Sequence, residues 1–435
     1  MRKLTVKNFS VIKDAELEFG KITVLIGPQS AGKSLLCKLA YFLGRETIEL
    51  AIRSIANLAS LTAFKSILKA QFIRRFTANS GLGGNAFVMF SAYHFAIELS
   101  WEDFEGNEEI QIDFSSEFEA EYGNLLAACS NQNIGGGIQR NYSQDNIRVR
   151  LNLLFGDGFI FDTYYIPAGR AFFTNVALGI NALRNPDIDP LVSEFATTIA
   201  WNTNRVSLSS EDAKRALWEI LAKMVEIAGG HVEGTSDAPV FVTKGNRQIS
   251  FPLLSSGIQE LLPMFNVLGR LASNREKQVI FIESEETASA FRRLVISKKL
   301  IYLEEPEAHI FPGTQYELVQ LFTWFSGEPT QDFSWVITTH SPYILTAFNT
   351  LIEAWRVGSK EGKREQVASL VPEKYWVNES DFAAYTIRDG VLVPIFEKEQ
   401  EGKEGSGLID GDYLDSVSDQ LGGEFEKLLD IEYAN

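Results

Sequence analysis

The chain has 435 residues, 45% of them hydrophobic and 12% aromatic, which is enough apolar material for two or three domains or one large core with insertions. Its 40 basic and 57 acidic residues leave a net charge of −17, so the surface as a whole repels nucleic acid and DNA binding would need a local basic patch. Two cysteines that lie far apart in the sequence, Cys37 and Cys129, argue against a disulfide scaffold or a cysteine-rich zinc site. The sequence shows no apolar run long enough to span a membrane and no signal peptide, so we expect a cytoplasmic protein.

Residues 1–45 are expected to form the first part of a nucleotide-binding core. Short strands are predicted over 4–8, 15–19 and 22–26, followed by a helix that ends near residue 44. Between the third strand and the helix, the spacing G-x-x-x-x-G-K-S is typical of a phosphate-binding loop. The loop supplies eight candidate nucleotide-binding residues: Gly27, Pro28, Gln29, Ser30, Ala31, Gly32, Lys33 and Ser34.

The residue types in this loop suit the binding of a nucleotide phosphate. Gly27 and Gly32 permit backbone conformations that turn successive N–H groups inward, which makes an anion site at a helix N-terminus. Lys33 is expected to reach the β- and γ-phosphates of ATP, and the Ser34 hydroxyl to ligate Mg²⁺. An ordinary glycine turn is the alternative, but the spacing and both flanking elements favour nucleotide binding.

Residues 46–155 are expected to form an α/β insertion outside the nucleotide core. Helical spacing covers 46–78, strands are predicted over 86–99 and 108–114, and another helix over 117–129. No motif that we can name covers this insertion.

The chain is expected to return to the core over residues 156–182. A strand over 161–166 ends in Pro167-Ala168-Gly169-Arg170, and the carboxyl end of a strand is where an open α/β sheet presents groups to a ligand. Arg170 is therefore a candidate for contacting phosphate or a facing lobe, although a structural or solvated arginine fits equally well. The apolar spacing within residues 183–230 predicts two helices that fold back on each other and form a short helical arm.

Residues 231–396 are expected to complete the core, beginning with a hairpin. Val232-Glu233-Gly234, followed by an aspartate, is similar to the metal-binding start of a TOPRIM nuclease. It lies upstream of the other motifs, however, where the chain needs a hairpin into strands at 240–242 and 248–251. We therefore favour the hairpin over the metal site.

A second anion site is predicted at Ser255-Ser256-Gly257, which precede a helix with Leu261 and Phe265 on one face. Serine and glycine at a helix N-terminus suit an anion, so Ser256 and Gly257 are candidate nucleotide contacts. One nucleotide can hardly use both anion sites of a single protomer if they lie apart. Two protomers packed head to tail could share it, whereas a simple N-cap is the alternative.

Two apolar strands end in groups suited to phosphate chemistry. The run Leu300–Leu303 precedes Glu304 and Glu305, a Walker B pattern in which Glu304 would hold the Mg²⁺ hydration shell and Glu305 would orient and deprotonate the attacking water. A second strand over 335–339 ends at His340, one of only four histidines in the chain.

The order of these motifs resembles the RecF, SMC and OLD branch of ABC-type ATPases, above all in Glu304-Glu305-Pro306-Glu307 and Thr338–Pro342. Within that branch the chain is similar to compact stand-alone ATPases of prokaryotic antiphage systems such as PARIS and Septu. The resemblance covers residues 1–45 and roughly 160–390. It implies an α/β P-loop fold of ABC type, with a mixed sheet flanked by helices.

The resemblance also implies roles for individual residues. Ser256 and Gly257 would reach the γ-phosphate bound to the opposite subunit, and His340 would hydrogen-bond the γ-phosphate and help to position the water. The segment Ala308–Pro312 resembles a loop that passes signals across the dimer. Most members of the family carry aspartate where this chain has Glu304, so the longer side chain leaves direct and water-mediated metal contact open.

The segment after Leu345 is shorter than in OLD-type proteins, which carry a TOPRIM nuclease there. Strands are predicted over 351–357 and 391–396, and residues 397–435 are expected to be an acidic linker and C-terminal docking segment. Asp410, Asp412 and Asp415 fit an acidic helix start better than a metal site.

We therefore expect an ATPase that uses ATP and Mg²⁺ and works as a head-to-tail homodimer or higher even-numbered homo-oligomer. The cycle of ATP binding and hydrolysis would control a separate effector, a nuclease or toxin, in antiphage defence. We expect no membrane partner. A RecF-like DNA-binding or repair protein is one alternative, which DNA-stimulated hydrolysis would favour. A self-sufficient metal-dependent nuclease using Glu233, or Asp410 and Asp412, is another, which plasmid nicking by the purified chain would favour.

Overall fold

A computed structural model gives the structure of the chain. It describes residues 2–76, 85–104, 107–131, 144–156, 162–175, 189–199, 211–235, 238–273, 278–284, 287–295, 298–327, 332–396, 407–409 and 423–427. Within these ranges, no helix combines the length and the apolar character that crossing a membrane requires.

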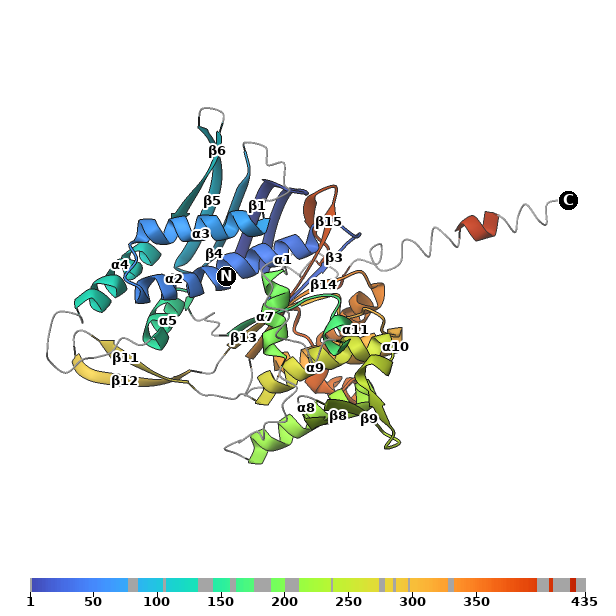
Figure 1. Cartoon of the computed structure of the whole chain (residues 1–435). Helices are drawn as coiled ribbons and strands as arrows, with labels where there is room; N and C mark the ends of the chain where they lie inside the picture. The colour runs from blue at the N-terminus through green and yellow to red at the C-terminus, as the bar shows by residue number, and fades with distance from the viewer. Residues whose placement is uncertain are drawn as a thin grey trace.

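A mixed sheet of eleven strands forms the centre of the molecule (Figure 1). Its order is β6-β5-β4-β1-β2-β16-β15-β3-β14-β13-β7. The strands are β1 (Arg2–Phe9), β2 (Ile12–Phe19), β3 (Ile22–Ile26), β4 (Phe87–Ala92), β5 (Phe95–Phe104), β6 (Asn107–Phe114), β7 (Asp162–Ile166), β13 (Lys298–Glu304), β14 (Asp332–Thr339), β15 (Phe382–Arg388) and β16 (Val391–Pro394). The predicted mixed α/β fold is confirmed.

Five neighbouring strands, β15, β3, β14, β13 and β7, run parallel to one another. Their side chains alternate between two apolar cores, as a sheet covered on both faces requires. In β14, Trp335 and Ile337 join the core on one face, whereas Val336 joins the core on the other. Because the strands are parallel, their carboxyl ends meet at one edge of the sheet, where the chain then turns into its loops.

Antiparallel strands complete the sheet, and β4, β5 and β6 come from the predicted insertion. β4 pairs with β1 along its length, from Lys7↔Phe87 to Arg2↔Ala92. The segment 46–155 is thus joined to the nucleotide core by main-chain hydrogen bonds and a shared apolar core. The single strand predicted over 86–99 is wrong, because a turn at Tyr93 and His94 divides β4 from β5; Tyr93 has a positive φ of 57°.

Helices cover both faces of the sheet. One apolar core holds residues of α1 (Lys33–Tyr41), α2 (Thr47–Ala56), α3 (Leu61–Phe76), α4 (Ser116–Asn131) and α5 (Gln144–Leu153), with a π-helix over Phe42–Glu46. The other holds residues of α6 (Ala171–Asn175), α7 (Pro190–Thr198), α8 (Glu211–Ala228), α9 (Ser256–Ser273), α10 (Pro312–Gly327) and α11 (Pro342–Gly358). Figure 1 shows α9, α10 and α11 grouped together, away from α2 and α3.

The described parts of the predicted helical arm pack into the molecule. Phe195 of α7 and Leu217, Ile220 and Met224 of α8 belong to the same core as α9. Asp189 caps α7 by accepting a hydrogen bond from the N–H of Leu191, so a local capping signal starts this helix. The polar cluster at 202–204 that divides the two helices lies outside the described residues.

The strand predicted over 351–357 is wrong, because these residues belong to α11. Pro342 at its first turn and Ser341, whose hydroxyl accepts from the N–H of Tyr343, start this helix. The buried residues continue at helical spacing through Phe348, Leu351 and Ile352, and that periodicity favours a helix. The remaining short elements are α12 (Arg364–Leu370) and the 3₁₀ turns Phe251–Leu253, Glu373–Tyr375 and Glu379–Asp381.

Two smaller sheets lie outside the main one. The predicted hairpin near residue 231 is confirmed as part of a three-stranded sheet of β8 (Gly230–Thr235), β9 (Ala238–Thr243) and β10 (Gln248–Ser250). The hairpin of β11 (Gln278–Ser284) and β12 (Thr287–Val295) was not predicted. This hairpin lies between α9 and β13 in the sequence.

Candidate functional site

The phosphate-binding loop connects β3 to α1 at the carboxyl edge of the parallel strands. Gly32 precedes the first helical residue with a φ of 108°, a conformation that favours glycine. A Cβ atom on Gly32 would lie 2.5 Å from Cδ1 of Ile12, so the β1–β2 turn packs directly against the loop. Ser30 also has a positive φ, of 60°, and Ser34 is half-buried in the first turn of α1.

Lys33 lies inside this loop. Its ammonium group donates hydrogen bonds to the carbonyl oxygens of Gly27 at 2.7 Å and Pro28 at 2.8 Å. Burial lowers the pKa of Lys33, an effect that the carboxylates of Glu305 and Glu307 oppose. The cation is therefore held in a partly desolvated position where an anion would interact with it strongly.

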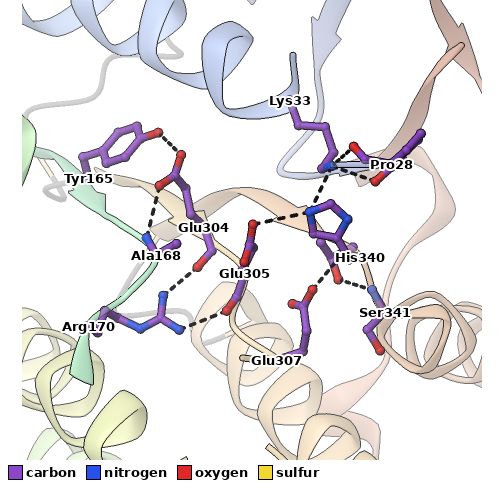
Figure 2. Close-up of polar contacts among 12 residues, drawn as sticks. Pro28, Lys33, Tyr165, Ala168, Arg170, Glu304, Glu305, Glu307, His340 and Ser341 are labelled. Atoms are coloured by element: carbon purple, nitrogen blue, oxygen red, sulfur yellow. Dashed lines mark hydrogen bonds and ion pairs between the residues drawn. The ribbon is translucent and has the colours of Figure 1, made fainter. Parts of the chain in front are cut away.

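His340 follows β14, the neighbour of β3, and its ring lies between Lys33 and Glu305. Nε2 of His340 is 3.3 Å from the Lys33 ammonium nitrogen and 3.4 Å from Oε1 of Glu305. A carboxylate oxygen of Glu307 accepts a hydrogen bond from the His340 backbone N–H at 2.6 Å. Figure 2 shows Lys33, from the start of α1, converging with His340 and Glu305, which follow β14 and β13.

The position of Glu305 is fixed by a backbone hydrogen bond and by its backbone conformation. Its N–H donates to the carbonyl of Thr338 at 2.9 Å, and its φ is 42°, in the left-handed region that costs free energy for a non-glycine residue. The side chain remains over a third exposed. The turn thus directs the carboxylate toward His340 and solvent, where it could accept a proton from a bound water.

Glu304 points the other way, into the protein (Figure 2). Oε1 accepts a hydrogen bond from the Tyr165 hydroxyl at 2.7 Å, and Oε2 accepts one from the Ala168 N–H at 3.1 Å. Burial, with the Glu304 charge as the next cause, holds the pKa of Tyr165 well above its usual value, so the phenol stays a donor. Sequence reasoning missed both donors, because nothing in a strand sequence states which neighbouring strand it will pair with.

The predicted magnesium ligands fit the chemistry of that ion. Ser34 and Glu304 offer a hydroxyl and a carboxylate, the hard oxygen donors that Mg²⁺ prefers. Within the described part of the chain, no three His, Cys, Asp or Glu side chains form a cluster able to hold a metal. A nucleotide-bound magnesium ion usually takes one or two ligands from the protein and the rest from phosphates and water.

Arg170 is positioned for structure and not for phosphate contact. Its side chain is 0% exposed, and its guanidinium donates to the carbonyl oxygens of Pro167, Glu304 and Glu305 at 2.9, 2.6 and 3.0 Å. Nε also lies 3.4 Å from a carboxylate oxygen of buried Glu260 on α9. The prediction that Arg170 contacts the nucleotide is therefore corrected, because its donors already bind the backbone around the Glu304-Glu305 turn.

Ser256 and Gly257 lie at the N-terminal end of α9, where Ser256 is exposed and Gly257 is half-buried. A Cβ atom on Gly257 would lie 2.8 Å from the carbonyl oxygen of His309, so only glycine allows the helix to approach the loop after Glu305 this closely. The structure thus brings Gly257 next to the Ala308–Pro312 loop. It does not bring it to the phosphate-binding loop of the same protomer in any described contact.

A cleft of about 530 Å³ opens beside the phosphate-binding loop. Its walls are Val11 from the β1–β2 turn, the loop residues Pro28–Ala31, and Thr386–Gly390 from the end of β15 and the turn that follows it. The carbonyl of Gly390 accepts a hydrogen bond from the N–H of Lys13 at 2.7 Å, which joins the two turns. The contribution of residues 386–390 was missed, because they lie more than 350 positions after the loop and carry no motif.

The residues considered for a nuclease do not form a site in the described structure. Glu233 lies on exposed β8, and its Oε1 is 2.8 Å from Nε2 of His231, a contact between neighbouring side chains on one strand face. Asp410, Asp412 and Asp415 lie outside the described residues.

One sequence family matches part of the chain. Residues 184–345 match the family described as an AAA ATPase domain. The matched segment includes the Ser256-Gly257 helix, the Glu304-Glu305 strand and His340, but it begins after the phosphate-binding loop. Over this segment the chain is therefore similar to an ATPase domain.

No curated protein matches the chain significantly. Solved structures with a similar chain path include the SMC head domain from Thermotoga maritima, with a TM-score of 0.38 and 11% identity over 91% of this chain and 98% of that one. The Smc head domain with an extended coiled coil, bound to the C-terminal domain of ScpA and derived from Pyrococcus furiosus, gives 0.32 and 13% over 91% and 96%. An ATP-binding cassette of an ABC transporter in its ADP conformation gives 0.30 and 12% over 90% of each chain.

Proposed function

We propose that this protein binds and hydrolyses ATP with the residues gathered at the carboxyl edge of β3, β13 and β14. The observation that carries the proposal is the convergence of Lys33 and Glu305 on His340, whose Nε2 lies 3.3 Å from the Lys33 ammonium nitrogen and 3.4 Å from Oε1 of Glu305. A cation for phosphate, an imidazole and a partly exposed carboxylate are the groups that phosphoryl transfer to water requires.

In the proposed reaction, the N–H groups at the start of α1 and the Lys33 ammonium bind the phosphates. The anion competes with the Gly27 and Pro28 carbonyl oxygens for the three ammonium hydrogens. Glu305 accepts a proton from the attacking water, whose oxygen bonds to the γ-phosphorus while the bond from that phosphorus to the bridging oxygen breaks and ADP leaves. His340, fixed through its N–H to Glu307, orients the Glu305 carboxylate and the terminal phosphate. The positive charge of Lys33 stabilises negative charge on the transferred group.

Ser34 and Glu304 would hold Mg²⁺, which neutralises phosphate charge when it is bound. The base and ribose would occupy the cleft beside the loop, where Val11, 49% exposed, offers an apolar surface for stacking. The exposed turn at Arg388 and Asp389 supplies polar groups to the same cleft.

We further propose that two copies pack head to tail, so that Ser256 and Gly257 of one reach the nucleotide of the other. Leu253, just before this serine-glycine sequence, and Phe311, in the loop that Gly257 contacts, are 78% and 79% exposed. Large apolar side chains this exposed, on adjacent segments, support a surface that a partner covers. A second copy is the proposed occupant because, among the described residues, no contact joins Ser256 or Gly257 to the phosphate-binding loop of the same protomer, so a facing copy would bring their anion site to a nucleotide.

The ATP-driven closure of this dimer would control a separate effector, a nuclease or toxin, in antiphage defence. This narrower part of the proposal is supported by the motif resemblance. It predicts that the protein alters the activity of an effector encoded beside it, and that Glu305→Gln abolishes this control. Co-purification with the product of the neighbouring gene, with and without ATP, tests it.

The first test is phosphate release from Mg-ATP by the purified chain and its Glu305→Gln variant. The carboxamide cannot accept the proton of the water, so hydrolysis should fall by roughly a hundredfold or more, while ATP binding measured by calorimetry persists. The mass of Glu305→Gln in solution, with and without Mg-ATP, then reports closure of the dimer. If the chain neither binds nor hydrolyses ATP, the proposal is wrong.

A further inference from the structure

The structure assigns to Tyr165 the positioning of the carboxylate on the magnesium side of the site. This inference rests on the proposed ATPase function, since it concerns how Glu304 would meet the metal. Tyr165 itself would touch neither the metal nor the nucleotide. Its role is to act through Glu304.

The pairing of two parallel strands brings the two residues together. Tyr165 in β7 stands opposite Tyr302 in β13, and Ile166 stands opposite Leu303, the residue before Glu304. The turn after β7 then folds back, so that the Ala168 N–H reaches the same carboxylate as the Tyr165 hydroxyl. β7 and its turn therefore supply a donor to each of the two Glu304 oxygens, at 2.7 and 3.1 Å.

These two donors fix the orientation of the carboxylate and leave part of its acceptor capacity unused. Each carboxylate oxygen has two lone pairs, so one hydrogen bond to each leaves further acceptor capacity. Among the described residues, no lysine or arginine forms an ion pair with the Glu304 side chain. Glu304 is buried, and a buried carboxylate held only by neutral donors is suited to receive a positive ion.

The Tyr165 ring is itself immobilised, which makes its hydroxyl a rigid support. It stacks on Tyr302 with ring centroids 6.0 Å apart and an interplanar angle of 15°, and it meets Tyr41 edge-on at 5.5 Å. Groups that hydrogen-bond a ligating carboxylate typically change metal affinity by 10- to 100-fold when they are removed. A hydroxyl on a packed aromatic ring is a strong candidate for such a group.

The test uses Tyr165→Phe, which removes the hydroxyl and keeps the ring. In the Glu305→Gln background, ATP binding is measured by calorimetry with Mg²⁺ and with EDTA, and the ratio of the two dissociation constants reports the contribution of the metal. We expect Tyr165→Phe to reduce this ratio by roughly tenfold or more, with the dissociation constant in EDTA unchanged. Tyr302→Phe, in the same stack, should leave both values unchanged.

A double-mutant cycle separates positioning from loss of packing. In a Glu304→Gln background the charge to be positioned is absent, so Tyr165→Phe should have no further effect on the magnesium ratio. An equal effect of Tyr165→Phe in both backgrounds, or none in either, would overturn the inference while leaving the ATPase proposal intact. Failure of the Glu305→Gln parent to bind ATP at all would overturn both.

Discussion

His340 and Lys33 are 307 positions apart in sequence, yet Nε2 of the imidazole lies 3.3 Å from the lysine ammonium nitrogen. Parallel pairing of β3 with β14 causes this, because Ile26 and Thr339 are register partners at the ends of the two strands. The residues that follow, the phosphate-binding loop and His340, must then leave the sheet side by side. The pairing of β3 with β14 thus brings the Lys33 ammonium group and the His340 imidazole together at the edge of the sheet.

Lys33→Ala should abolish measurable ATP hydrolysis and weaken ATP binding, because the buried cation of the loop is lost. Removal of one such electrostatic group typically costs roughly 100- to 1,000-fold in rate. Lys38→Ala is the matched control. It lies on the same helix but pairs with Asp189 at the surface, at 2.7 Å, so its rate should stay near that of the parent. Equal loss in the two variants would contradict the role of Lys33.

His340→Ala should lower kcat by roughly a hundredfold and change the ATP dissociation constant much less. Glu307→Ala should have a smaller effect in the same direction, because it removes the carboxylate that accepts from the His340 N–H. Glu317→Ala, on α10 and paired with Lys223, serves as the control. Phosphate release and calorimetry measure the two quantities separately, and an effect of Glu307→Ala on binding alone would argue against this positioning.

Arg170→Met should destabilise the protein by about 3 to 5 kcal/mol, since it leaves Glu260 buried without its cation. The double variant Arg170→Met/Glu260→Leu should recover part of that loss, because both buried charges are then absent. Arg364→Met breaks an exposed pair with Glu373 and should change stability little, because solvent screens such a pair. Urea unfolding measures these differences. Normal stability combined with lost ATP affinity would instead favour phosphate contact by Arg170.

Leu253→Asp and Phe311→Asp should each prevent ATP-driven association of the Glu305→Gln protein, because a carboxylate would be buried in the proposed interface. ATP binding to the single chain should persist. Leu370→Asp is the control, since Leu370 is 83% exposed on α12, outside the proposed interface. Mass in solution with and without Mg-ATP distinguishes the variants. Association that survives both changes would exclude this surface from the interface.

Local sequence was sufficient wherever the signal lies within one short segment. The strand, glycine loop and helix around Gly32 and Lys33 were predicted correctly, because spacing and conformational preference decide them over a dozen residues. The run ending at Glu304 and Glu305 was recognised as a buried strand for the same reason, since four apolar residues precede the two carboxylates. Residues 351–357 show the limit of this reasoning, because a short apolar run does not distinguish a strand from a helix that began earlier.

Only the tertiary structure decided what the polar side chains near these segments contact. Arg170 could be assigned to phosphate or to structure from its sequence, and contacts with residues 90 to 135 positions away resolve the question in favour of structure. Tyr165 carries no signal in the sequence, because its hydrogen bond to Glu304 depends on β7 pairing with β13. Spacing along the sequence determines which residues share a helix or strand. The order of the strands determines which of them end at the same edge of the sheet. The carboxylates of Glu304 and Glu305 have different surroundings because of that strand order.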